Sequence, residues 1–145
     1  MSAEENKTIV RQFYENVFTK GDLDLIENLV TPDFVSHVPG APNFGPGPAG
    51  LRQLVSVYRT AFPDLRCTIE DQLAEGDKVA TRITYRGTQH GNLGDVPPTG
   101  KQMTITGIEI TRMSDGKMAE AWVNFDALGQ LQQLGLIPQS DPVPA

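Results

Sequence analysis

The chain has 145 residues, of which 39% are hydrophobic and 21% charged, and this composition suits one folded domain. Its formal net charge of −6 argues against nucleic acid and against an anionic membrane surface as partners, because both attract clustered Lys and Arg. Cys67 is the single cysteine, so we expect no internal disulfide, and the His and Cys spacing indicates no metal site. The polar start MSAEENKTIV predicts no signal peptide, and no apolar run is long enough to span a membrane, so we expect a cytoplasmic protein.

The first third of the chain is predicted to be mainly helical. Ser2 and Glu5 fit a capping box, and one helical face follows with Ile9, Val10, Phe13, Tyr14 and Val17. Gly21-Asp22 is expected to end this helix and to cap a second, shorter one, which ends at Thr31-Pro32. A short strand then leads into a Gly/Pro-rich loop over 41–50, and a third helix starts near Leu51 and ends before Pro63.

The rest of the chain is predicted to be mostly β. Strands with period-two alternation are expected over 65–75, from Val79 to Arg86, from Met103 onward and over 118–125. Asp115-Gly116 predicts a tight hairpin turn before the last strand. The apolar parity changes between Ile105 and Ile108, which predicts a β-bulge at Gly107.

Helices followed by antiparallel strands indicate an α+β fold. We expect residues 1–138 to form a single domain, a cone-shaped barrel in which a curved, mostly antiparallel sheet wraps around the N-terminal helices. Residues 139–145 contain two prolines without periodicity and are predicted to be a disordered tail.

Four stretches carry a resemblance to a known family: FYENVFTKGDLDLIENLVTPDFVSHVPG, AFPDLRCTIEDQLAEGDKVATR, VPPTGK followed by GIEITRMSDGKMAEAW, and DALGQLQQLG. Over nearly its whole length the sequence resembles the SnoaL-like polyketide cyclases, which have the nuclear transport factor 2-like fold. The resemblance implies an intramolecular aldol ring closure without a cofactor, neither metal nor organic, on a small apolar substrate. It also implies a homodimer or homotetramer.

This chain has other residue types at the positions that match the family's catalytic residues. The acid/base aspartate of the final strand falls on Val123, when the chain is aligned on the DGK turn and the C-terminal tail. The histidine of the preceding strand falls on Glu109, a nearby glutamine falls on Gly107, and another histidine falls on Gln89.

Three residues remain candidates for catalysis. Glu109, in an apolar hollow, would have a raised pKa and serve as general acid or base; alternatively it is exposed and pairs with Arg82 or Arg112. His37 suits proton transfer near neutral pH, or is a half-buried histidine bonded to a loop carbonyl. Asp126 is a candidate acid, but it also fits the N-cap of a C-terminal helix.

The candidate substrate-binding residues come from both halves of the chain. If the cyclase register holds, the last strand turns Ala119, Ala121, Val123 and Phe125 inward, and Trp122 lies on the opposite face. The residues we assign to substrate binding are Tyr14, Tyr58, Ala121, Trp122, Val123, Phe125 and Gln89. For the tyrosines and Trp122, core packing is the alternative.

Three functions are therefore considered. The first is a cofactor-independent, cyclase-like enzyme acting on a small apolar carbonyl compound. The second is a non-catalytic protein that binds a small hydrophobic ligand, which Val123 at the aspartate position favours. The third is a hydrolase or isomerase of the same fold, for which Arg82 and Tyr85 are available.

Overall fold

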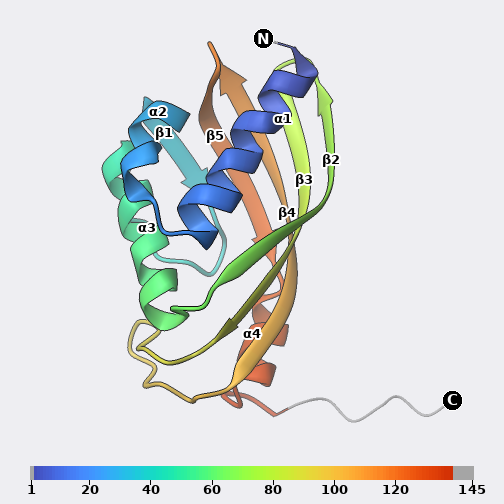
Figure 1. Ribbon diagram of the computed structural model, residues 1–145. Helices are drawn as coiled ribbons and strands as arrows, with labels where there is room; N and C mark the ends of the chain where they lie inside the picture. Colours follow the sequence, from blue (N-terminus) through green and yellow to red (C-terminus); the bar gives the residue numbers. More distant parts are fainter. Residues whose placement is uncertain (1, 139–145) are drawn as a thin grey trace, which may run out of the picture.

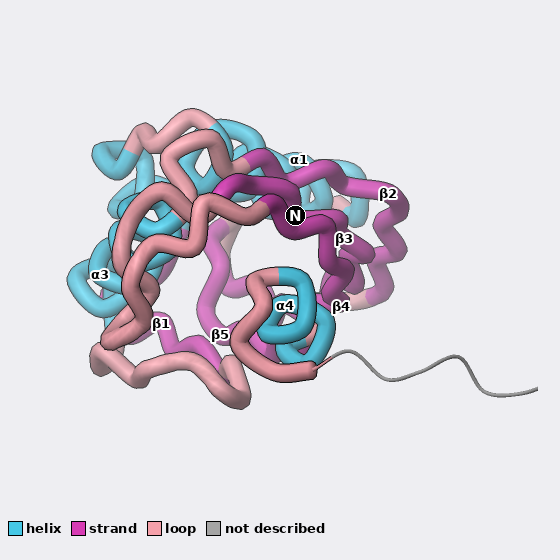
Figure 2. The backbone as a smooth tube through the Cα atoms, turned by 90° about the horizontal axis from the view of Figure 1, so that it is seen from below, coloured by secondary structure: helices cyan, strands magenta, loops and turns pink. Residues whose placement is uncertain are grey.

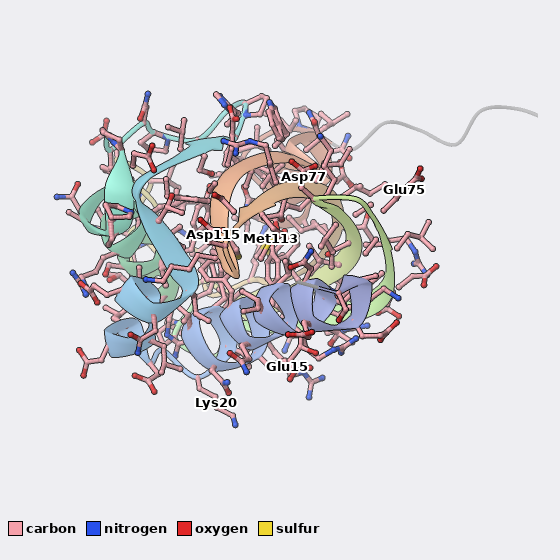
Figure 3. All side chains as sticks on the ribbon, turned by 90° about the horizontal axis from the view of Figure 1, so that it is seen from above. Glu15, Lys20, Glu75, Asp77, Met113 and Asp115 are labelled. Atoms are coloured by element: carbon pink, nitrogen blue, oxygen red, sulfur yellow. The ribbon has the colours of Figure 1, made fainter. Side chains whose placement is uncertain are left out.

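The N-terminal segment forms one continuous helical run along the sheet. The structure, a computed structural model, describes residues 2–138. Helix α1 (Ala3–Gln12) begins with the predicted capping box, in which the Ser2 hydroxyl accepts from the Glu5 N–H at 3.1 Å. It continues into a π-helical segment, η1 (Phe13–Thr19), that buries Phe13, Tyr14 and Val17. Glu15 and Lys20 point outward on the solvent side of this segment (Figure 3).

The second and third helices differ from the prediction at their boundaries. The short helix consists of a 3₁₀ turn, η2 (Leu23–Leu25), and one α-helical turn, α2 (Ile26–Leu29), and the Asp22 side chain makes no capping hydrogen bond. Strand β1 (Val30–His37) follows at once. Helix α3 (Gly47–Ala61) begins four residues earlier than expected, because a proline in the first turn of a helix needs no hydrogen-bond partner for its nitrogen.

A five-stranded curved sheet forms the rest of the fold. The remaining strands are β2 (Arg66–Glu75), β3 (Lys78–Thr88), β4 (Gln102–Ser114) and β5 (Lys117–Phe125), and helix α4 (Ala127–Gln133) follows them. The strand order is β1-β5-β4-β3-β2, with β1 parallel to β5 and the other pairs antiparallel. Helices α1 and α3 lie along the concave side of the sheet (Figure 1). The predicted α+β architecture is confirmed, although the sheet stays open between β1 and β2 instead of closing into a barrel.

The prediction of a β-bulge at Gly107 is wrong. Strands β3 and β4 pair without a shift from Lys78 opposite Arg112 to Thr88 opposite Gln102, and burial alternates along the whole of β4. Ile108 and Ile110 therefore lie on the outer, exposed face, and Glu109 points inward. Gly107 is needed for close packing instead, since a Cβ there would lie 2.9 Å from Cε2 of Tyr85.

The hairpin turn between β4 and β5 has the expected geometry. Asp115 and Gly116 both have positive φ values, of 49° and 80°, which suits a tight two-residue turn. The predicted disordered tail, 139–145, lies outside the described residues. Within residues 2–138 no helix is both long and apolar enough to cross a membrane.

Candidate active site

A cavity of about 690 Å³, its mouth included, lies between η1, α3, α4 and the concave face of the sheet. Figure 2 looks toward this space from the end of the molecule at which α4 lies. Its lining is mainly aromatic and aliphatic, which is typical of small-molecule sites. The lining residues include Phe13, Phe18, Phe34, Leu51, Leu54 and Ile105.

Glu109 is the only carboxylic acid among the described residues that line this cavity. The alternation of β4 turns it inward, and only 3% of the residue is exposed. One carboxyl oxygen accepts from the Tyr14 hydroxyl at 2.7 Å, and the other accepts from Oγ1 of Thr111 at 2.5 Å. The alternative pairing with Arg112 is not formed, because Arg112 contacts Glu120 on the outer face.

Burial sets the protonation behaviour of this carboxyl group. Desolvation raises the pKa of Glu109 above its ordinary value, and the hydrogen bonds from Thr111 and then Tyr14 oppose that rise. Burial, together with the nearby charge of Glu109, raises the pKa of Tyr14 well above 10.0, so this hydroxyl remains a donor. A carboxyl with a raised pKa in an apolar cavity is suited to take up and return a proton.

Two further tyrosines bring hydroxyl groups to the cavity. Tyr58 comes from α3 and Tyr85 from β3, and burial raises the pKa of both. The ring of Tyr85 lies 6.5 Å from that of Tyr14, edge to face. Tyr85 was not among the residues that we assigned to substrate binding, although its place on the inward face of β3 follows from the period-two pattern.

Five of the seven predicted substrate-binding residues line the cavity: Tyr14, Tyr58, Ala121, Val123 and Phe125. Trp122 lies on the outer face of β5, where its ring stacks on His37 at 5.6 Å. The fully buried Gln89 bonds to Thr99, Gly91 and Pro97 and so holds the turn before β4 together.

The structure does not bring the other two catalytic candidates to Glu109. Nε2 of His37 lies 2.7 Å from a carboxyl oxygen of Glu120, and the ring lies outside this cavity. The Asp126 carboxylate accepts from the N–H of Gly129 at 2.9 Å and caps α4. Within the part of the chain that the structure describes, no group of three or more His, Cys, Asp or Glu side chains is arranged to hold a metal ion.

Comparison with known proteins places this site in a family. The profile of the SnoaL-like polyketide cyclases matches residues 8–134. Nogalonic acid methyl ester cyclase of Streptomyces nogalater is 27% identical over 123 residues, which is 83% of this chain and 90% of that protein. Aklanonic acid methyl ester cyclase of Streptomyces peucetius is 28% identical over 131 residues, 88% of each chain.

Solved structures agree with this assignment. The structure of TsrD from Streptomyces laurentii superimposes with a TM-score of 0.85 at 26% identity, covering 94% of this chain and 99% of that one. The fold, the cavity between helices and curved sheet, and the match over nearly the whole chain all lead to one assignment. This protein belongs to the SnoaL-like polyketide cyclase family.

Proposed function

We propose that the protein is a cofactor-independent, cyclase-like enzyme that closes a ring by an aldol-type step, or carries out a related proton transfer, on a small apolar carbonyl compound. One observation carries this proposal: a buried carboxyl group, Glu109, faces an apolar cavity and is bonded to two hydroxyl groups. Family membership supports the cyclase-like function.

Glu109 lies where its carboxyl group can take the place of the family's aspartate. By the resemblance, the family's acid/base aspartate falls on Val123. Val123 pairs directly with Glu109 across β4 and β5, and both line the cavity. Directly opposed residues have Cβ atoms about 4.5–5.5 Å apart. A carboxyl at either position therefore reaches the same space, and we infer that the acid/base group of this chain is on β4.

The proposed reaction needs only one acid/base group. The Glu109 carboxylate removes a proton from the carbon next to a substrate carbonyl and becomes the neutral acid. The enolate carbon bonds to a second carbonyl of the same molecule, whose oxygen becomes an alkoxide. Glu109 returns its proton to that alkoxide, so the protons balance. The hydroxyls of Tyr58 and Tyr85 are available to hydrogen-bond the enolate oxygen.

Glu109→Gln tests the proposal. One assay follows deuterium exchange into the methyl group of 2-acetonaphthone, an apolar ketone, in D₂O by NMR. A second follows ring closure of nogalonic acid methyl ester, the compound in the relative's name. We expect a loss of about 100-fold or more in both rates, in the range of general acid–base catalysis. Glu70→Gln is the matched control, since Glu70 is exposed and lies outside the cavity. Unchanged rates in Glu109→Gln would contradict the proposal.

Ligand binding without chemistry is the second candidate function. The apolar side chain of Val123 at the aspartate position is the observation that favours it. A wild-type protein that binds 2-acetonaphthone but exchanges none of its methyl protons above the buffer rate would support this alternative. Measured turnover would exclude it.

We also propose that the protein is a homodimer that pairs through the outer face of its sheet. Ile108, Ile110 and Trp122 lie on that face of β4 and β5 with exposures of 55%, 43% and 38%, and Ile110 is the cross-strand partner of Trp122. Contiguous exposed apolar side chains on a sheet indicate an interaction surface. A second copy presents the same apolar patch and can cover it by two-fold symmetry.

A further inference from the structure

Gln130 presents an amide group to the apolar cavity with hardly any protein partner. It lies on α4, is 6% exposed and lines the cavity. Its amide nitrogen is 3.5 Å from the sulfur of Met103, and its amide oxygen accepts from none of the described residues. A thioether is a weak acceptor, so this contact uses little of the hydrogen-bonding capacity of the amide. The Gln130 side chain therefore has hydrogen-bonding capacity that a bound molecule can use.

Helix α4 is fixed firmly in the place where it presents Gln130. Asp126 caps its first turn, and the Asp126 N–H donates to the Thr106 carbonyl at 3.0 Å. The Gln133 amide bonds to both the N–H and the carbonyl of Thr104, at 2.7 and 3.0 Å. Leu134 is buried just after the helix. These contacts hold α4, and with it Gln130, in a fixed position at the cavity.

Gln130 and Glu109 are polar residues of a mainly apolar cavity lining, and they are separated along β4. Met103, the neighbour of Gln130, lies on the same face of β4 as Glu109 and six residues before it. In an extended strand that separation is about 20 Å, which the curvature of the sheet shortens. Apolar groups such as Ile105 and Phe125 line the cavity as well. A ligand that contacts both residues is elongated and carries a polar group at each end.

We propose that Gln130 is a specificity-determining residue, which binds a hydroxyl or carbonyl group at the end of the substrate remote from the reacting carbon. The statement that the reacting carbon lies at Glu109 rests on the proposed function. The polar contact at Gln130 does not rest on it, because this contact follows from the place of the amide in the cavity lining and from its single, weak hydrogen bond to Met103.

Two fluorescent probes that differ by one hydroxyl group test this inference. They are 2-acetonaphthone and 6-hydroxy-2-acetonaphthone, whose added hydroxyl lies at the far end of the rings from the ketone. We expect the wild type to bind the hydroxylated probe about 3- to 10-fold more tightly, the gain of one net hydrogen bond. In Gln130→Leu this preference should fall to about 1-fold.

Matched variants separate a contact from a folding defect. Gln132→Leu makes the same change on the same helix, outside the cavity lining, and should keep the preference. Gln130→Met keeps the length of the side chain without its amide and should behave as Gln130→Leu does. An unchanged preference in both Gln130 variants overturns the inference, as does a wild type without any preference.

The same probes distinguish this inference from the proposed function. Glu109→Gln should abolish proton exchange and keep the preference for the hydroxylated probe, because the Gln130 end is untouched. Normal exchange in Glu109→Gln would refute the proposed function alone. Loss of the hydroxyl preference in Gln130→Leu and Gln130→Met, with the preference kept in Gln132→Leu, would support the inference by itself.

Discussion

Glu109 and Val123 stand directly opposite each other on β4 and β5, and both side chains face the cavity. A carboxyl group at either position would therefore reach the same space. The neighbours of the two positions differ, however, because the Tyr14 and Thr111 hydroxyls are aimed at Glu109. The surrounding hydroxyl groups therefore favour a carboxyl group on β4 over one on β5.

Moving the carboxyl group back to β5 should restore part of the activity. Glu109→Val should lower the rate of methyl proton exchange in 2-acetonaphthone by about 100-fold or more, because it removes the proposed acid/base group. Adding Val123→Asp should recover a fraction of that rate, since the new carboxyl enters the same cavity without its hydroxyl donors. The control is Glu109→Val with Val123→Asn, which adds a polar side chain without an acid. Equal proton-exchange rates in the two double variants would show that a carboxyl group at position 123 cannot replace the one at position 109.

The hydroxyl groups around Glu109 should tune the pH dependence of the rate. Since the pKa of Glu109 is raised, the wild-type rate should rise with pH through a midpoint above the ordinary value of a glutamate. Thr111→Val and Tyr14→Phe each remove a hydrogen bond that stabilises the carboxylate, so the pKa should rise further and the midpoint should move to higher pH. Thr111 opposes the rise more than Tyr14 does, and its variant should shift the midpoint further.

The measurement is a profile of exchange rate against pH for each variant. Thr106→Val is the control, because Thr106 lies on the same strand with its side chain on the exposed face. A midpoint that moves to lower pH in Thr111→Val would contradict the claim that the Thr111 hydroxyl stabilises the Glu109 carboxylate.

Features that depend on neighbours in the sequence could be predicted well. The Ser2–Glu5 capping box and the Asp115-Gly116 turn are decided by a few adjacent residues. Alternation along β5 placed Ala121, Val123 and Phe125 on one side, but only the resemblance to the cyclases indicated that this side faces inward, as the structure has it.

Features that depend on distant residues could not be predicted. Ile108 and Ile110 resemble core residues in the sequence, and only the pairing with β3 and β5 shows that they lie outside. His37 lies outside this cavity and contacts Glu120, which lies 83 residues later. Gln130 gave no signal in the sequence, because its role depends on the sulfur of Met103 and on the apolar cavity.

Asp126 should behave as a helix cap. Asp126→Ala removes the acceptor for the Gly129 N–H and should lower the free energy of unfolding by about 0.5–2 kcal/mol. Asp126→Ser keeps a capping oxygen and should lose much less. Denaturant unfolding measures both variants, and the 2-acetonaphthone exchange rate of Asp126→Ser should stay near that of the wild type. A large loss of exchange in a stable Asp126→Ser protein would instead assign the carboxylate to the chemistry.

The outer sheet face should hold the dimer together. Ile110→Lys places a charge in the centre of the apolar patch and should convert the dimer into a monomer, because a buried unpaired charge is strongly disfavoured. Light scattering at micromolar concentration measures the mass. Leu73→Lys is the control, since Leu73 is 69% exposed on the edge strand β2 and is expected to stay outside the interface. A wild type that is monomeric, or an Ile110→Lys protein that remains dimeric, would refute this interface.

Glu109 should make the folded protein less stable as the pH rises. Its pKa is raised in the folded state and is about 4.3 in an unfolded chain. Between these two values the folded state holds a proton that the unfolded state has released, so the free energy of unfolding falls with rising pH. Above the folded pKa the loss is complete and the contribution of this group is constant.

Glu109→Gln removes this titration and keeps a side chain that can bond to Tyr14 and Thr111. The stability of the variant relative to the wild type should therefore increase from about pH 4 upward and level off above the folded pKa. Denaturant unfolding at a series of pH values measures the difference. Glu70→Gln is the matched control, because it removes one carboxyl group at an exposed position outside the cavity. A difference for Glu109→Gln that does not change with pH would mean that the cavity holds the ionised carboxylate as readily as water does.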